Sequence, residues 1–236
     1  MAIVTIVGSG MMGSALAFPA RENGHEVRVV GTHLDREIIK ECLKSNKHPK
    51  FDRPFPNGIK FYQIEDLQTA LVGANVVIGG VSSFGVDWFG DNVLPVIPES
   101  AIVLTVTKGL MDTKEGKLLT YPELWENKLK SLNKKLSLNA VGGPCTSYEL
   151  VSHDQTEVSF CGKELEKLSY LKEIMQTDYY HVSITTDVVG VESAVALKNG
   201  YALGIALTIG LNQKNFKEDT LHFNSQAAVF GQATKE

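Results

Sequence analysis

Residues 3–13 read Ile3-Val4-Thr5-Ile6-Val7-Gly8-Ser9-Gly10-Met11-Met12-Gly13. The β-branched run before the glycines predicts a strand covered on both faces, and residues 14–23 have helical spacing. Between a strand and a helix, Gly8 permits a tight turn, Gly10 lets the backbone approach a pyrophosphate, and Gly13 lets the helix pack closely on the strand. A purely structural turn is the alternative, but the flanking strand and helix favour a dinucleotide site built from Gly8, Ser9, Gly10, Met11, Met12 and Gly13.

The rest of the chain repeats the alternation of strand and helix. Further strands are expected at 26–30, 59–62, 75–81, 101–107, 136–141, 157–161 and 181–185, and helices at 34–45, 65–72, 115–132 and 164–176. This alternation predicts an α/β fold with a Rossmann-type, doubly wound and mainly parallel sheet. After residue 185 the pattern is helical. We therefore expect a dinucleotide-binding domain over 1–185 and the start of an all-helical domain over 186–236.

The composition is that of an ordinary globular protein whose core needs no disulfide or metal. Of 236 residues, 43% are hydrophobic and 21% charged, and the net charge of −4 argues against binding nucleic acid through bulk charge. The three cysteines form no Cys-x-x-Cys pair and the histidines lack metal-ligand spacing, so we expect no metal site and a reducing, cytoplasmic setting. Glu192, Lys198 and Asn199 interrupt the apolar stretch 188–211, which favours a buried helix over a membrane span.

The end of the second strand bears on the choice of cofactor. NAD enzymes usually have an acidic residue there that holds the ribose hydroxyls. This chain has Gly31-Thr32-His33, and Asp35 and Arg36 follow a little later. A missing carboxylate with His33 and Arg36 nearby predicts that NADP is preferred to NAD, because an arginine at this place can receive the 2′-phosphate. The alternative is that Arg36 only begins a solvated helix.

Two later segments also follow strands, where the ligands of open parallel sheets bind. Lys108, in Thr107-Lys108-Gly109-Leu110, can meet a phosphate or a polar substrate group, or it is an ordinary exposed lysine. The segment Gly142-Gly143-Pro144-Cys145-Thr146-Ser147 offers N–H groups and hydroxyls to a substrate or nicotinamide, or else Thr146 or Ser147 caps a helix. Nucleophilic catalysis by Cys145 is not expected, because no histidine partner is evident.

The helix pattern near residue 198 carries the candidate general base. It reads Val188-Val189-Gly190-Val191-Glu192-Ser193-Ala194-Val195-Ala196-Leu197-Lys198-Asn199-Gly200 and is apolar nearly all round, which predicts burial. Burial lowers the pKa of an ammonium and makes a lysine usable as a base near neutral pH. Lys198 is therefore predicted to be catalytic, with Asn199 as a neutral donor and acceptor. The alternative is a Lys198 whose ammonium extends to water.

Together and in this order, the four segments resemble the NAD(P)-dependent glycerol-3-phosphate dehydrogenase family over essentially the whole chain. The matching residues are Gly8, Gly10 and Gly13, then Lys108-Gly109-Leu110, Gly143-Pro144 followed by Glu149, and Ala196-Leu197-Lys198-Asn199. The resemblance implies that Lys198 is the proton acceptor and that Lys108 and the segment around Gly143 and Cys145 contact substrate. It implies cofactor contacts at Met11, Met12, Thr32, Lys108 and Ser147.

The chain also departs from that family. Ser147 stands where the family normally has alanine, which is a small change. Family members continue beyond residue 236 with helices that supply an aspartate and an arginine–asparagine pair for the substrate and its phosphate. On this resemblance the chain is expected to be truncated at its C-terminal end.

The leading hypothesis is an oxidoreductase that interconverts sn-glycerol 3-phosphate and dihydroxyacetone phosphate by hydride transfer with NAD(P). Lys198 accepts the proton, and Lys108 is the next catalytic candidate. The alternatives are an inactive NAD(P)-binding fragment and a related reductase of the hydroxy-acid or ketopantoate type, against which Lys108-Gly109-Leu110 counts. The expected partner is a small phosphorylated three-carbon substrate, with a homodimer allowed and neither nucleic acid nor membrane bound.

Overall fold

The computed structural model describes residues 1–215, without the side chains of Asn199 and residues 212–215, and one sheet forms its centre. In spatial order its strands are β10 (Tyr180–Thr185), β9 (Thr156–Gly162), β8 (Ser137–Gly142), β5 (Ile102–Thr105), β4 (Val76–Gly79), β1 (Ile3–Val7), β2 (Glu26–Val30) and β3 (Lys60–Tyr62). Neighbouring strands are parallel except β8 and β9, which are antiparallel. The predicted Rossmann-type, mainly parallel α/β sheet is confirmed.

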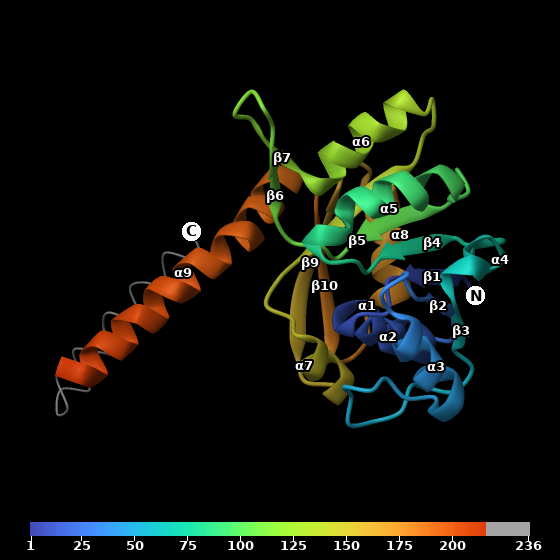
Figure 1. The fold of residues 1–236 in the computed structure, drawn as a ribbon, viewed down its shortest axis with the longest axis horizontal. Coiled ribbons are helices and arrows are strands. Elements are labelled where there is room, and N and C mark those ends of the chain that lie inside the picture. The colour runs from blue at the N-terminus through green and yellow to red at the C-terminus, as the bar shows by residue number, and fades with distance from the viewer. Residues whose placement is uncertain (216–236) are drawn as a thin grey trace.

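Helices cover both faces of this sheet (Figure 1). One face carries α1 (Met11–Ala15), α2 (Ala17–Glu22), α3 (Arg36–Ser45), α7 (Ser147–Ser152) and α8 (Leu165–Met175). The other face carries α4 (Leu67–Leu71), α5 (Val86–Asn92) and α6 (Tyr121–Ser131). The connections include 3₁₀ helices at Ile64–Asp66, Ser83–Gly85 and Leu94–Val96 and a hairpin of β6 (Leu110–Asp112) and β7 (Leu118–Thr120).

Alternate side chains of the strands fill two separate cores, as expected of strands that are covered on both faces. In β1, Val4 and Ile6 enter the core under α1 and α2, whereas Val7 enters the core under α5 and α6. Because both faces are packed, the loops that follow the strands are held at fixed positions along one edge of the sheet. We call the edge where β1 to β5 and β8 end the carboxyl edge, and the edge where they begin the amino edge.

One helix begins later than its sequence pattern indicates. The helix expected over 115–132 begins at Tyr121, and the residues before it belong to the hairpin of β6 and β7. Thr120 and Glu123 form a capping box at its start. Pro122 lies in the first turn, which tolerates proline because its N–H would have no partner there.

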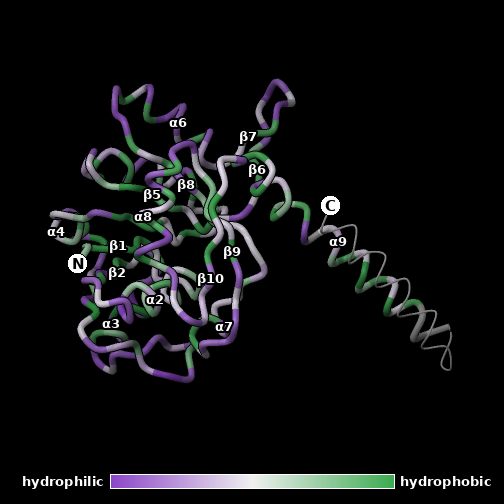
Figure 2. Tube along the Cα trace, turned by 180° about the vertical axis from the view of Figure 1, so that it is seen from behind, coloured by the Kyte–Doolittle hydropathy of each residue, from purple (hydrophilic) through white to green (hydrophobic). Residues whose placement is uncertain are grey.

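The last described element, α9 (Val188–Asn215), extends away from the sheet (Figures 1 and 2). Its first turns pack on the strands β6 to β9, where Glu192 and Val195 are buried. Farther along, leucine side chains are exposed at Leu197, Leu203, Leu207 and Leu211. The expectation that this helix is buried along its length, Lys198 included, is therefore wrong. Lys198 is exposed and follows the turns in which Glu192 and Val195 are buried.

The same helix is long and apolar enough, over residues 188–211, to cross a membrane by length and composition alone. A core helix of a soluble protein meets the same criterion. The expected absence of a membrane span therefore stays a prediction.

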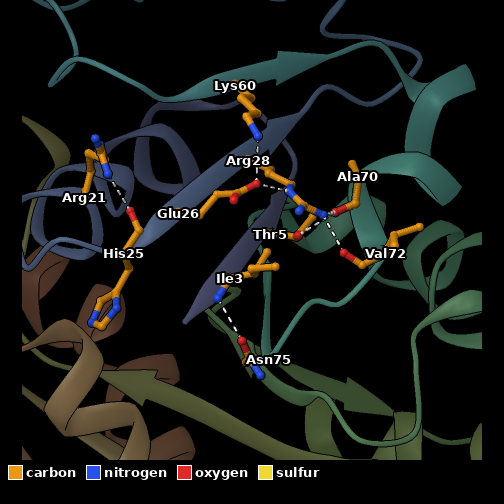
Figure 3. Close-up of polar contacts among 10 residues, drawn as sticks. All are labelled: Ile3, Thr5, Arg21, His25, Glu26, Arg28, Lys60, Ala70, Val72 and Asn75. Carbon is orange, nitrogen blue, oxygen red and sulfur yellow. Dashed lines mark hydrogen bonds and ion pairs between the residues drawn. The ribbon is translucent and has the colours of Figure 1, made fainter. Parts of the chain in front are cut away.

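At the amino edge, polar side chains are paired with one another and with backbone carbonyls (Figure 3). Arg28 on β2 donates to Glu26 at 2.8 Å and to the carbonyls of Ala70 and Val72 at 2.9 and 2.7 Å. The ammonium of Lys60 lies 2.9 Å from the same carboxylate. Hydrogen bonds from Lys60 and Arg28 lower the pKa of Glu26, so this network keeps its charges at neutral pH.

Candidate active site

The glycine-rich turn follows β1 at the carboxyl edge, and its three glycines have different tasks. Gly8 has φ +107°, and a Cβ on it would lie 2.7 Å from the backbone of Gly80. A Cβ on Gly13 would lie 2.3 Å from the carbonyl oxygen of Gly8. Gly10 has φ −62°, and a Cβ there would meet only the Gly80 carbonyl oxygen, at 3.9 Å. The packing of the turn therefore requires Gly8 and Gly13, whereas open space remains in front of Gly10.

Ser9, the residue between the first two glycines, is held by three side chains. Its N–H donates to the carboxylate of Asp35 at 3.2 Å, and its carbonyl accepts from the hydroxyl of Ser14 at 3.0 Å. Nε2 of His48 lies 3.2 Å from the same carbonyl, while Nδ1 of His48 accepts the N–H of Lys50 at 3.1 Å. Because Nδ1 accepts, Nε2 carries the proton and donates. Burial lowers the pKa of His48, which keeps the ring neutral.

The segment after β2 does carry a carboxylate, but it is turned inward. One oxygen of Asp35 accepts the N–H and the hydroxyl of Thr32, both at 2.8 Å, in addition to the N–H of Ser9. Asp35 thereby ties the end of β2 to the glycine turn. Arg36 pairs with Glu65, and both side chains are exposed.

A groove of about 390 Å³ lies beside this segment. His33 and Trp88 of α5 form its aromatic wall, with 5.6 Å between their ring centroids. The full lining is His33, Ile64, Glu65, Leu67, Gln68, Trp88, Asn92 and Val96. Trp88 is not among the residues predicted from the sequence, because it also packs on the core and its pattern is that of a core residue.

Several predicted residues converge on one small hollow between the glycine turn and the end of β8. The ammonium of Lys108 donates to the carbonyl of Gly143 at 3.4 Å. The hollow has a volume of about 20 Å³, room for one water, and is lined by Met12, Val106, Lys108, Val141, Gly142, Gly143, Cys145, Val158 and Tyr180. Ser147 is buried at the start of α7, and Met11 packs partly on the core. Met12, Lys108, Gly143 and Cys145 are thus brought together.

Packing fixes the glycine pair at the end of β8. A Cβ on Gly142 would lie 2.5 Å from a methyl group of Val191 on α9. Gly143 has φ +146°, and a Cβ there would lie 2.9 Å from the carbonyl oxygen of Glu157. The hydroxyl of Thr146 caps α7 in a capping box with Glu149, so the capping alternative for this segment is confirmed.

Cys145 is buried, and burial raises the pKa of its thiol to about 11. Nucleophilic and metal-binding cysteines act as thiolates, whose fraction at neutral pH is negligible with such a pKa. Cys145 is therefore a lining residue of the hollow, and the expectation that it is not a nucleophile stays a prediction.

The charge of Lys198 affects the pKa of Lys108, a residue of this hollow, although the side chain of Lys198 is exposed. Burial lowers the pKa of Lys108, and the positive charge of Lys198 lowers it further. The side chain of Lys108 is itself exposed, so neither lysine is buried in the way expected of Lys198. The side chain of Asn199, the other residue predicted on this helix, lies outside the described residues.

Three fully buried residues near the carboxyl edge have polar groups without a hydrogen-bond partner within residues 1–215: Ser9 and Tyr180 through their hydroxyls and Glu192 through its carboxyl. All three residues are 0% exposed. Oε1 of the partly buried Gln63, which follows β3, is also without a partner in this range. Leaving a buried polar group unpaired costs about 1–3 kcal/mol, so most such groups in proteins are paired. Their presence beside the open space at Gly10 and the hollow at Lys108 indicates an edge that is built to hold other molecules.

A hollow of about 470 Å³ at the amino edge lacks these features. It is lined by Asn75, Ser100, Ile102, Glu166, Lys167, Ser169, Tyr170 and Glu173. None of these residues belongs to a predicted motif, and no glycine turn faces it. Among the residues that were described, no group of three or more His, Cys, Asp or Glu side chains could hold a metal ion. The candidate site is therefore at the carboxyl edge.

Comparison with known proteins shows which family the chain resembles. Residues 3–167 match the family model described as the N-terminus of NAD-dependent glycerol-3-phosphate dehydrogenase. Over 213 residues the chain is 37% identical to an NADP(+)-dependent glycerol-3-phosphate dehydrogenase from Archaeoglobus fulgidus. The matched region covers 90% of this chain and 62% of that relative. The chain thus spans about three fifths of the length of this relative.

Two solved structures share the fold. A glycerol-3-phosphate dehydrogenase from Plasmodium falciparum superposes with a TM-score of 0.82 at 18% identity, over 99% of this chain and 64% of that one. The enzyme from Coxiella burnetii gives a TM-score of 0.74 at 23% identity, over 89% of this chain and 62% of that one. At these identities the likeness establishes the fold alone.

Proposed function

The chain belongs to the NAD-dependent glycerol-3-phosphate dehydrogenase family, and from that membership we propose that it interconverts sn-glycerol 3-phosphate and dihydroxyacetone phosphate with NAD(P). One observation carries the proposal. The open space at Gly10, the hollow at Lys108 and the buried unpaired groups all lie near one edge of the sheet. That edge combines a place for a dinucleotide with cations for a phosphorylated substrate.

The residues of the carboxyl edge fit a dinucleotide. A pyrophosphate can approach the backbone in front of Gly10, which caps α1 without any side chain. The groove between His33 and Trp88 suits the adenine ring, because aromatic walls stack on planar rings. Met12 and the hollow beside Lys108 lie on the other side of the turn, which suits the nicotinamide end. When bound, NAD(P) supplies the hydride acceptor or donor.

NADP is the proposed preference over NAD. The carboxylate that could hold ribose hydroxyls, Asp35, is occupied by Thr32 and Ser9 inside the protein. His33 and the exposed Arg36 stand at the same end of the site. The relative from Archaeoglobus fulgidus is named as NADP(+)-dependent, which supports the same preference.

The proposed proton acceptor is Lys198, and Lys108 is the second candidate. In oxidation the base takes the proton of the substrate hydroxyl, and in reduction its ammonium returns it. Lys198 is supported by the reach of its charge to Lys108. Lys108 is supported by its own lowered pKa, which eases the loss of its proton. We place the substrate at the mouth of the hollow that Lys108 lines with Gly143 and Cys145, because the hollow itself has room for only one water. Asn199 remains a proposed contact.

A second candidate function is NAD(P) binding without turnover. The exposure of Lys198 favours it, since a base that is open to water is neither desolvated nor fixed against a substrate. On this alternative the glycine turn and the groove act alone.

The proposal also includes a domain division, a cellular setting and a set of partners. We propose a dinucleotide-binding domain over 1–185 and a partial helical domain over 186–236, of which 216–236 lie outside the described residues. The division falls near the end of β10 and the start of α9. A cytoplasmic setting, the allowed homodimer, and the absence of nucleic-acid and membrane partners belong to the same proposal.

The two candidates are separated by one paired experiment. Calorimetry measures the binding of NADPH and NADH, and the oxidation of each is followed spectroscopically with dihydroxyacetone phosphate. Binding together with turnover supports the dehydrogenase, and binding without turnover supports the second candidate. Absence of dinucleotide binding in the folded chain contradicts both.

A further inference from the structure

Glu192, near the start of α9, has no part in the mechanism above. It is 0% exposed, and neither of its carboxyl oxygens has a hydrogen-bond partner among the residues described. An isolated buried carboxylate is costly, and burial raises the pKa of Glu192 to about 7. The state of this carboxyl is therefore set by the groups that face it.

The packing of α9 holds Glu192 toward the interior. Val191 and Val195, on either side of it in the chain, press on the end of β8, where a Cβ on Gly142 would lie 2.5 and 2.9 Å from their methyl groups. The N–H of Gly190 donates to the carboxylate of Asp187 at 2.8 Å, which fixes the first turn of the helix. The carboxyl thus stays buried while the rest of the helix runs into solvent.

Three titratable groups face Glu192 from the elements packed around it: Lys108 after β5, Tyr121 on α6 and Cys161 on β9. Burial, and then the charge of Glu192, raise the pKa of Tyr121. The same causes raise the pKa of Cys161 to about 12. Neither group is charged near neutral pH. Lys108 is therefore the cation whose charge favours an ionised Glu192.

Lys108 interacts through its charge with this buried carboxyl and also lines the proposed substrate site. Its ammonium reaches the carbonyl of Gly143 and lines the hollow with Cys145. Among the ion pairs of the described residues none includes Lys108. Its charge is therefore available to two groups, the carboxyl of Glu192 and an anion at the mouth of the hollow.

We propose that Glu192 is a positioning residue that sets how strongly Lys108 holds the phosphate of the substrate. When ionised, Glu192 draws the ammonium of Lys108 away from the anion; when protonated, it leaves the charge of Lys108 to the anion. The identity of the anion rests on the proposed function, but the competition for Lys108 does not. Because the pKa of Glu192 is about 7, anion affinity falls as the pH rises through neutrality.

The test uses sulfate as the probe, because its charge is constant over the range. NMR titration of the whole chain gives the sulfate dissociation constant at about pH 6 and about pH 8.5. We expect roughly tenfold weaker binding at the higher pH in the unaltered protein. Glu192→Gln is expected to bind equally at both, apart from histidine titration, and Glu192→Asp to restore the pH dependence. Glu149→Gln is the matched control, since it removes an exposed carboxylate that caps α7 and whose pKa is lowered.

Two results overturn the proposal. One is a Glu192→Gln protein that keeps the full pH dependence, and the other is an unaltered protein that binds no sulfate at either pH. If Glu192→Gln does not fold, Lys108→Met decides, because removing Lys108 must abolish the pH-dependent part of sulfate binding. Failure of glycerol-3-phosphate turnover leaves this measurement intact, and failure of this measurement leaves turnover intact.

Discussion

The two edges of the main sheet differ in how many of their polar groups have hydrogen-bond partners. At the amino edge, Arg28 is paired with Glu26 and two backbone carbonyls, and Asn75 accepts the N–H of Ile3 at 2.8 Å. Two groups are exceptions there within residues 1–215, because Nε2 of His25 and Oδ1 of Asn139 have no partner. Near the carboxyl edge, the fully buried residues Ser9, Tyr180 and Glu192 have polar groups without partners in the same part of the chain.

This difference separates the tasks of the two edges. Groups that are already satisfied stabilise the sheet but have little to offer a ligand. Groups that are buried and unpaired lower the stability of the fold, and a hydrogen bond from a bound molecule offsets that loss.

The largest expected effect is on kcat, and it distinguishes Lys198 from Lys60, a lysine at the amino edge. In a form of the protein that turns over substrate, Lys198→Met is expected to reduce kcat by about 10²- to 10⁴-fold, the usual contribution of a general acid–base group. Lys60→Met, which removes an exposed lysine at the amino edge, is expected to leave kcat unchanged. Steady-state kinetics of both proteins checks this. Near-normal turnover in Lys198→Met would pass the role of base to Lys108.

The buried carboxyl near the carboxyl edge is expected to make stability depend on pH. The pKa of Glu192, about 7, is raised above its usual 4.5, so the folded protein binds the proton more tightly than the unfolded chain. Its contribution is fully present below the unfolded pKa and is lost as the pH rises through 7. The loss is about 3 kcal/mol. Urea denaturation at several pH values should show this fall in the unaltered protein and not in Glu192→Gln; identical curves contradict it.

At the amino edge, removal of Arg28 is expected to cost stability without affecting the ligand. Arg28→Met leaves the carbonyls of Ala70 and Val72 and the carboxylate of Glu26 without their donor, a loss of about 1–3 kcal/mol. Denaturant unfolding measures the loss, and calorimetry with NADPH should give unchanged affinity. A marked fall in affinity would show that the two edges are not independent.

The smallest expected effect concerns the choice of dinucleotide. Arg36 is exposed and already paired with Glu65, so its contribution to holding a 2′-phosphate is screened by water. Arg36→Ala is expected to reduce the preference for NADPH over NADH by less than about tenfold. Dissociation constants for both cofactors measure the ratio, and an unchanged ratio assigns the preference elsewhere, with His33 as the next residue to replace.

Much of the carboxyl edge could be predicted from the sequence because its determinants are local. The spacing of Gly8, Gly10 and Gly13 specifies the turn within six residues, and a parallel sheet brings Lys108 and Gly143 to one edge once their strands are recognised. The support of Ser9 by His48 could not be predicted, since it joins residues 39 apart in the chain.

The course of α9 could not be predicted from the sequence either. The apolar sequence of α9 predicts that other residues pack against it along its length. The leucines of α9 are nevertheless exposed, because hydropathy alone does not specify which residues would cover them. The inward orientation of Glu192 could not be predicted from the sequence either. It depends on how Val191 and Val195 meet Gly142, a contact that no spacing within the helix reveals.

The central claim is that the carboxyl edge holds a dinucleotide in front of Gly10. The most direct test is calorimetry of NADPH binding to the unaltered chain and to Gly10→Val. Valine is compatible with the extended backbone at this position, where φ is −62° and ψ is 172°, so the fold and its melting temperature should be kept. We predict that the affinity falls by about tenfold or more, or about 1.4 kcal/mol at least. Equal affinity in the folded variant contradicts the claim.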